Sequence, residues 1–191
     1  VSATKKVAFS QGNLQYQAST DTWRFAEHQY DMVGMGYGLT NEGMSCYVAG
    51  NIQNSDNREI SSTYSGWIDL FGWGIGNNPT NASNNDEDYP TFVDWGVNKI
   101  SNGGNVSNAW FTLSYDEWYY LLRERTNAEE KQGVACVNGI NGLVLLPDNW
   151  TLPSSVHFTS GFASNNSYDY FKRVNTYTAS EWTLMEEAGA V

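Results

Sequence analysis

The sequence is short of basic residues and of long apolar runs, and each shortage excludes a class of function. Ten Lys and Arg stand against 21 Asp and Glu, which gives a formal net charge of −11. That field repels a phosphate backbone, so we expect no nucleic-acid partner. No apolar run approaches the ~20 residues that cross a bilayer, so we expect no membrane span. The longest run, residues 142–147, has the size of a buried strand.

Cysteine and histidine are also scarce, with two of each. Two cysteines cannot build a disulfide framework, and no CxxC spacing indicates a metal or redox site. Nothing local brings Cys46 and Cys136 together, so we expect them to stay unpaired. The two histidines, His28 and His157, lack an HxxxH or HExxH spacing, so we expect each to be a surface or structural residue and not a catalyst.

Aromatic residues, in contrast, are abundant: 8 Trp, 12 Tyr and 8 Phe in 191 residues. This content is too high for a disordered chain. The length fits one core, so we expect a single domain over residues 1–191. The chain begins at Val1 and not at Met, from which we expect a processed or excised piece whose export signal has been removed.

Local patterns predict an α+β fold. Alternation in residues 6–16 and 22–26 predicts an N-terminal β-hairpin, and residues 133–147 predict a second hairpin around an Asn-Gly turn. Residues 34–108 are rich in Gly, Asn, Ser and Asp, which indicates a long loop-rich region.

Two helices are predicted by capping boxes, in which a hydroxyl residue precedes a Glu by three positions. Ser114 opens a helix over residues 118–125, and Thr178 opens one beginning near Ala179. In the second helix Trp182 and Met185 lie three positions apart, so we expect both to face the core.

The middle of the chain, residues 40–108, holds most of the excess acid. Its oxygen-rich loops suit Ca²⁺, the one cofactor we consider, and the candidate ligands are Asp56, Asp86 and Asp88. Asp69, Asp94 and the acidic run at residues 86–88 could supply an acid and a base for glycoside cleavage. Asp in loops more commonly caps turns, so we favour a structural role over a catalytic pair.

Tryptophans among polar loops can stack on a sugar ring whose hydroxyl groups bind Asn and Asp. The candidate ligand-binding residues are Trp95 and Trp110 with Asp94 and Asn98. For Trp67 and Trp73 we expect a core role, because their neighbours are apolar.

Five stretches, in fixed order along nearly the whole chain, resemble one family; they are residues 7–16, 23–31, 60–74, 94–98 and 139–148. The family comprises the C-type-lectin-like, formylglycine-generating-enzyme-like domains of gut Bacteroidetes surface proteins, some of which are variable proteins of diversity-generating retroelements. The resemblance implies two helices, a small antiparallel sheet and extensive loops that display a binding surface. It assigns no role to the cysteines.

The same resemblance implies a further strand after residue 189, which this sequence lacks. We therefore expect a C-terminally incomplete domain that is prone to self-association or strand pairing. The function we expect is non-catalytic binding of a protein or glycan ligand by a secreted, periplasmic or outer-surface protein. The alternatives are a carbohydrate-active hydrolase and a structural module of a surface assembly.

Overall fold

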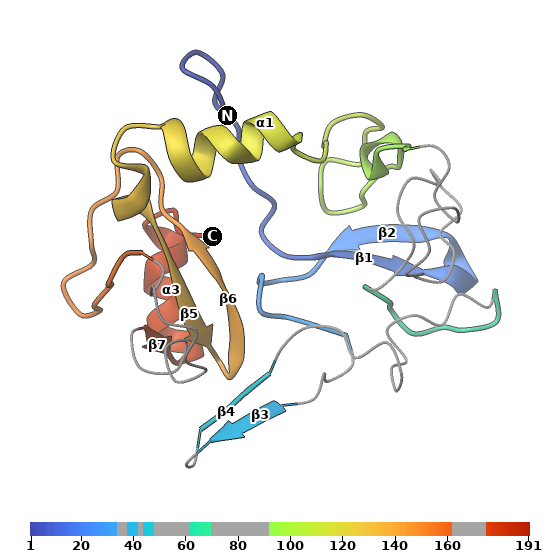
Figure 1. Cartoon of the computed structure of the whole chain (residues 1–191). Coiled ribbons are helices and arrows are strands. Elements are labelled where there is room, and N and C mark those ends of the chain that lie inside the picture. The colour runs from blue at the N-terminus through green and yellow to red at the C-terminus, as the bar shows by residue number, and fades with distance from the viewer. Residues whose placement is uncertain (34–37, 42–43, 48–61, 70–91, 162–174) are drawn as a thin grey trace. The chain divides into compact units, whose positions relative to one another are not determined.

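The computed structural model describes residues 1–33, 38–41, 44–47, 62–69, 92–161 and 175–191 (Figure 1). They belong to two compact units. Unit 1 contains residues 1–9, 37–49 and 114–191, and unit 2 contains residues 10–36 and 50–113. Each unit is assembled from segments that are separated in the sequence, so neither unit corresponds to one continuous stretch of the chain.

Unit 2 is built on the predicted N-terminal hairpin, which the structure confirms. Strands β1 (Leu14–Gln17) and β2 (Thr22–Phe25) pair antiparallel, and Asp21, with a φ of 49°, closes the turn between them. The alternation places Tyr16, Trp23 and Phe25 on one face, where all three are buried.

Two further segments complete the core of unit 2. Ile68 exchanges two backbone hydrogen bonds with Tyr16, and the backbone at Ile100 lies parallel to Trp23. Both isoleucines are fully buried beside the rings of the hairpin. The core therefore joins the hairpin to segments far along the sequence.

Unit 1 contains a five-stranded mixed sheet in the order β3-β4-β6-β5-β7. The strands are β3 (Gly38–Asn41), β4 (Met44–Tyr47), β5 (Gln132–Val137), β6 (Ile140–Leu145) and β7 (Thr176–Tyr177). β5 and β6 form the second predicted hairpin. Asn138 and Gly139 have φ values of 48° and 83°, as a two-residue turn with both residues in the left-handed region requires.

The cysteines contradict the sequence-based expectation. Cys136, buried on β5, is disulfide-bonded. Cys46, in β4, is the only other cysteine in the sequence. The spacing of cysteines in the sequence carries no information about such a bond, because strand order and register decide which residues meet.

Both predicted helices are present, each with its capping box. α1 (Tyr115–Tyr119) continues as a wider helical turn to Glu124 and is capped by Ser114 and Glu117. α3 (Ala179–Glu187) is capped by Thr178 and Glu181. The described residues thus form an α+β structure.

α3 packs on the sheet as its sequence predicts. Trp182 and Met185 are buried, and the Trp182 ring lies 5.7 Å from that of Tyr177 on β7. Beyond the helix, Val191 exchanges two backbone hydrogen bonds with Leu145, so the edge of β6 is paired at that residue. None of the helices in the described part of the chain is long and apolar enough to span a bilayer.

Two buried polar side chains hold the sheet of unit 1 together. Asn175, which has no exposed surface, accepts from the Thr159 N–H at 2.8 Å and donates to the carbonyls of Val134 and Thr159 at 2.8 and 2.9 Å. Arg125 donates from Nη1 and Nη2 to the carbonyls of Leu146 and Lys131 at 2.8 and 2.9 Å. Both side chains hydrogen-bond to backbone carbonyls that lie in or directly beside β5 and β6.

Candidate functional site

The four predicted ligand-binding residues lie in one small part of unit 2. Residues 95–97 form a single helical turn, and Asp94 precedes it as the cap. One Asp94 oxygen accepts from the Gly96 N–H at 2.8 Å, and the other accepts from the Thr112 N–H at 2.7 Å. A single carboxylate therefore closes the turn and fastens it to the segment around Thr112.

Asn98 closes the same turn from its other end. Its side chain is buried, and its amide donates to the Trp95 carbonyl at 3.0 Å. Asn108 donates its N–H to the Gly96 carbonyl at 2.6 Å. A β-carbon on Gly96 would lie 1.7 Å from the Trp110 carbonyl oxygen, so the two segments meet backbone to backbone.

The two tryptophans are half-buried against the core of unit 2. The Trp95 ring lies 5.5 Å from that of Trp23. Trp110 meets Phe25 edge to face at 4.7 Å and donates its indole N–H to the Gly103 carbonyl at 2.8 Å. Each ring is thus fixed by packing on one side, which leaves the rest of its surface partly exposed.

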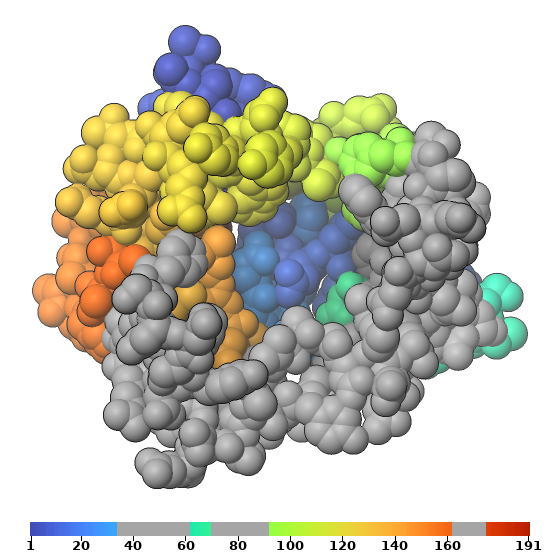
Figure 2. Space-filling model, viewed as in Figure 1, coloured from blue at the N-terminus to red at the C-terminus, as the bar shows by residue number. Residues whose placement is uncertain are grey.

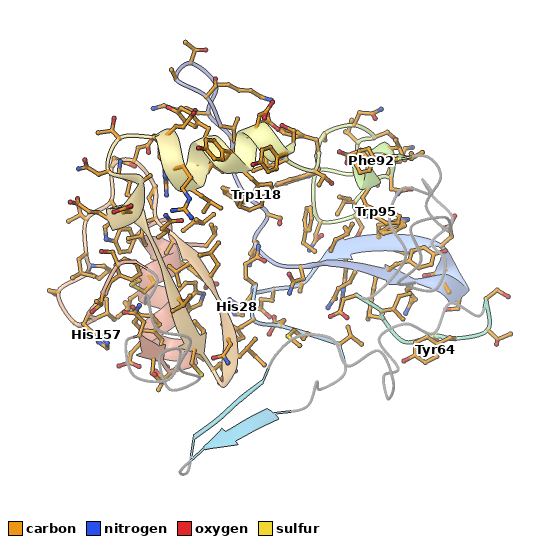
Figure 3. The ribbon with its side chains drawn as sticks, viewed as in Figure 1. His28, Tyr64, Phe92, Trp95, Trp118 and His157 are labelled. Carbon is orange, nitrogen blue, oxygen red and sulfur yellow. The ribbon has the colours of Figure 1, made fainter. Side chains whose placement is uncertain are left out.

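Several apolar side chains of these joined segments are exposed. Phe92 is 52% exposed, Phe111 49% and Val97 38%. We call Phe92, Trp95, Val97 and Phe111 the aromatic surface. Figure 3 labels Phe92 and Trp95, and Figure 2 shows the green segment that begins near residue 92 on the visible face. Large apolar side chains that are exposed on and beside a hydrogen-bonded turn are suited to binding another molecule.

The other sequence candidates have different outcomes. Asp56, Asp86, Asp88 and Trp73 lie outside the described residues. Within the described ranges, no group of three or more His, Cys, Asp and Glu side chains is placed to hold a metal ion. Asp69 accepts from the Val33 N–H at 2.6 Å, which is a structural role of the kind we expected.

The histidines also make structural contacts. The His28 ring stacks on Tyr30 at 4.8 Å, and its backbone N–H donates to Asp31. The His157 carbonyl accepts from the Tyr177 hydroxyl at 2.6 Å. Burial raises the pKa of Tyr177 to about 12, and the nearby charge of Glu181 adds to this rise.

The core role expected for Trp67 is wrong. Its ring is partly exposed and lies outside the buried cluster, with the guanidinium carbon of Arg24 3.8 Å from the ring centroid. The apolar neighbours of Trp67 misled the sequence-based interpretation, because alternation sends Ile68 inward and Trp67 outward. No motif in the sequence indicates Arg24 as a binding residue. The alternation in β2 nevertheless places its side chain on the other face of the strand from Trp23 and Phe25.

Comparisons of the chain with protein-family models, with curated proteins and with solved structures gave no match. The C-type-lectin-like assignment therefore stays a prediction from sequence resemblance.

Proposed function

We propose that this chain is a non-catalytic binding module of the C-type-lectin-like kind, which takes a protein or glycan ligand at a bacterial cell surface. One observation carries the proposal. The aromatic surface consists of exposed and half-buried apolar side chains on and beside a turn, and the carboxylate that caps this turn binds the backbone of two segments. Aromatic side chains that are already ordered bind with a small loss of conformational entropy, which is why such residues dominate binding interfaces.

The hydrogen bonds of two of the carboxylates considered for acid–base catalysis support a binding role and not a catalytic one. Both oxygens of Asp94 accept backbone N–H groups, and Asp69 also accepts one. These hydrogen bonds give both carboxylates a structural role, because they fasten backbone segments to one another. We therefore propose binding without hydrolysis.

The proposed location is outside the cytoplasm, as a secreted, periplasmic or outer-surface protein. A disulfide at Cys136 supports this, since such bonds persist in oxidising compartments. The formal charge of −11 supports the expectation of no nucleic-acid partner. Fractionation of the source cells tests the location, and detection in the cytoplasm alone would contradict it.

A binding screen with surface variants tests the function. The purified chain is applied to a glycan array and to a panel of extracellular proteins, with Ca²⁺ and with a chelator, because Asp56, Asp86 and Asp88 remain our proposed ligands for that ion. For any ligand found, we expect the double variant Phe92→Ser/Phe111→Ser to bind at least about tenfold more weakly.

The matched control is Leu152→Ser, which removes an apolar side chain that is 43% exposed and lies in unit 1. It should bind as the unchanged chain does, and all proteins should melt at similar temperatures. Equal binding by the double variant and the control would refute the assignment of the aromatic surface. Steady hydrolysis of a bound glycan would refute the non-catalytic role.

A further inference from the structure

A second polar arrangement lies on the hairpin of unit 2, on the side opposite its core. In the β1–β2 register Gln15 is directly opposite Arg24. Both alternate with the buried residues Tyr16 and Trp23, so they share the other face of the hairpin. Trp67 joins them from the segment that pairs with β1 through Ile68.

Arg24 is fixed on this face by two different contacts. Its Nε donates to the Gln15 side-chain oxygen at 2.9 Å, and its guanidinium carbon lies 3.8 Å from the centroid of the Trp67 ring. Gln15 is itself 4% exposed, so its amide is a rigid partner. The plane and the direction of the guanidinium are therefore both set before any ligand arrives.

The outer edge of the guanidinium retains its hydrogen-bonding capacity. Nη1 and Nη2 of Arg24 donate to no residue that the structure describes, although the side chain is only partly exposed. Arg125 is a useful contrast, because both of its terminal nitrogens donate to backbone carbonyls. Arg125 has a structural role, whereas Arg24 presents two parallel N–H groups in the geometry that a carboxylate accepts.

The charge of the chain narrows the ligand class. A formal charge of −11 repels a polyanion, so a strand of phosphates or an acidic peptide would approach against the field. A sugar that carries one carboxylate among neutral hydroxyl groups meets less repulsion. Its ring can also lie against the partly exposed Trp67.

We propose that Arg24, oriented by Gln15 and Trp67, binds the carboxylate of a uronic-acid sugar. The proposal rests on the binding role proposed above but uses a separate set of residues. It assigns a sugar with a single carboxylate as the ligand of a chain whose overall charge would not suggest an acidic ligand.

Titration calorimetry with D-glucuronate and D-galacturonate tests this site, and glucose serves as the neutral counterpart. We expect the uronates to bind at least about tenfold more tightly than glucose, and rising salt to weaken them. Arg24→Gln should remove this preference. Arg24→Lys should keep part of it, because an ammonium retains the charge but not the planar fork.

The matched control is Arg123→Gln, which removes an equal charge from an exposed position in unit 1 and should leave uronate binding unchanged. Thermal melting of each variant checks folding, and Arg24→Lys keeps the test valid if Arg24→Gln does not fold. Equal affinity for glucuronate and glucose would refute the site.

Two further comparisons test whether the bound carboxylate must belong to a sugar and whether Arg24 binds it. Acetate or a short acidic peptide that binds as tightly as glucuronate would refute the sugar assignment. If Arg24→Gln left uronate binding intact while Phe92→Ser/Phe111→Ser abolished ligand binding, the proposed function would stand and this site would be wrong.

Discussion

Asn175 should be among the residues of unit 1 that are most sensitive to substitution. Its fully buried amide makes three hydrogen bonds, which join the segment before β7 to Val134 on β5 and to Thr159. In Asn175→Ala the Val134 carbonyl loses its partner in a buried place, and such an orphaned group costs about 1–3 kcal/mol. Thr159 is exposed, so water can replace part of its two lost bonds.

The expected sum is a loss of about 2–4 kcal/mol in the free energy of unfolding. For a chain of this length that corresponds to a fall in Tm of roughly 5–15 °C. Urea denaturation followed by tryptophan fluorescence measures it. Asn149→Ala, which truncates an exposed asparagine, is the matched control and should change stability by less than about 0.5 kcal/mol.

Asn175→Asp separates the hydrogen bonds from the volume of the side chain. The carboxylate can still accept from Thr159 but places an oxygen against the two carbonyls that the amide had served. Burial would raise its folded-state pKa above the unfolded value near 3.9. The protonated form is then favoured in the fold, so the variant is least impaired below about pH 4 and loses about 1.4 kcal/mol per pH unit above it, up to the folded pKa.

Two results would refute this reasoning. One is a loss below about 1 kcal/mol for Asn175→Ala, which is too small for a buried unpaired carbonyl. The other is an Asn175→Asp variant whose stability, relative to Asn175→Ala, does not fall as the pH rises from about 4 to 7.

Two further predictions concern Gly96 and Tyr177. Gly96→Ala should destabilise unit 2 by about 2 kcal/mol or more, because its β-carbon would overlap the Trp110 carbonyl. Gly142→Ala is the control and should be tolerated, because its β-carbon meets nothing within 4 Å; equal denaturation curves for the two variants would contradict the close packing at Gly96. The pKa of Tyr177 is raised to about 12, so the stability that this shift contributes is complete below pH 10 and is lost as the pH rises from 10 to 12. The free energy of unfolding should fall by about 2–3 kcal/mol over this range for the unchanged chain but not for Tyr177→Phe, as denaturation at each pH would measure.

The sequence by itself determined the features whose cause lies within a few residues. Ser114 and Thr178 each precede a Glu by three positions, and both form the capping boxes predicted from that spacing. Asn138 and Gly139 form the turn of the second hairpin because they tolerate positive φ. Partial alternation of apolar and polar residues likewise predicted the first hairpin, which the structure confirms.

Only the tertiary structure decided how distant segments meet. The second hydrogen bond of Asp94, from the Thr112 N–H, and the stacking of Arg24 on Trp67 both join residues far apart in the sequence. Local propensity carries no information about such pairs, because they depend on strand order and register. For that reason the sequence could nominate Asp94 and Trp95 as a site, whereas the orientation of Arg24 had to be read from the folded chain.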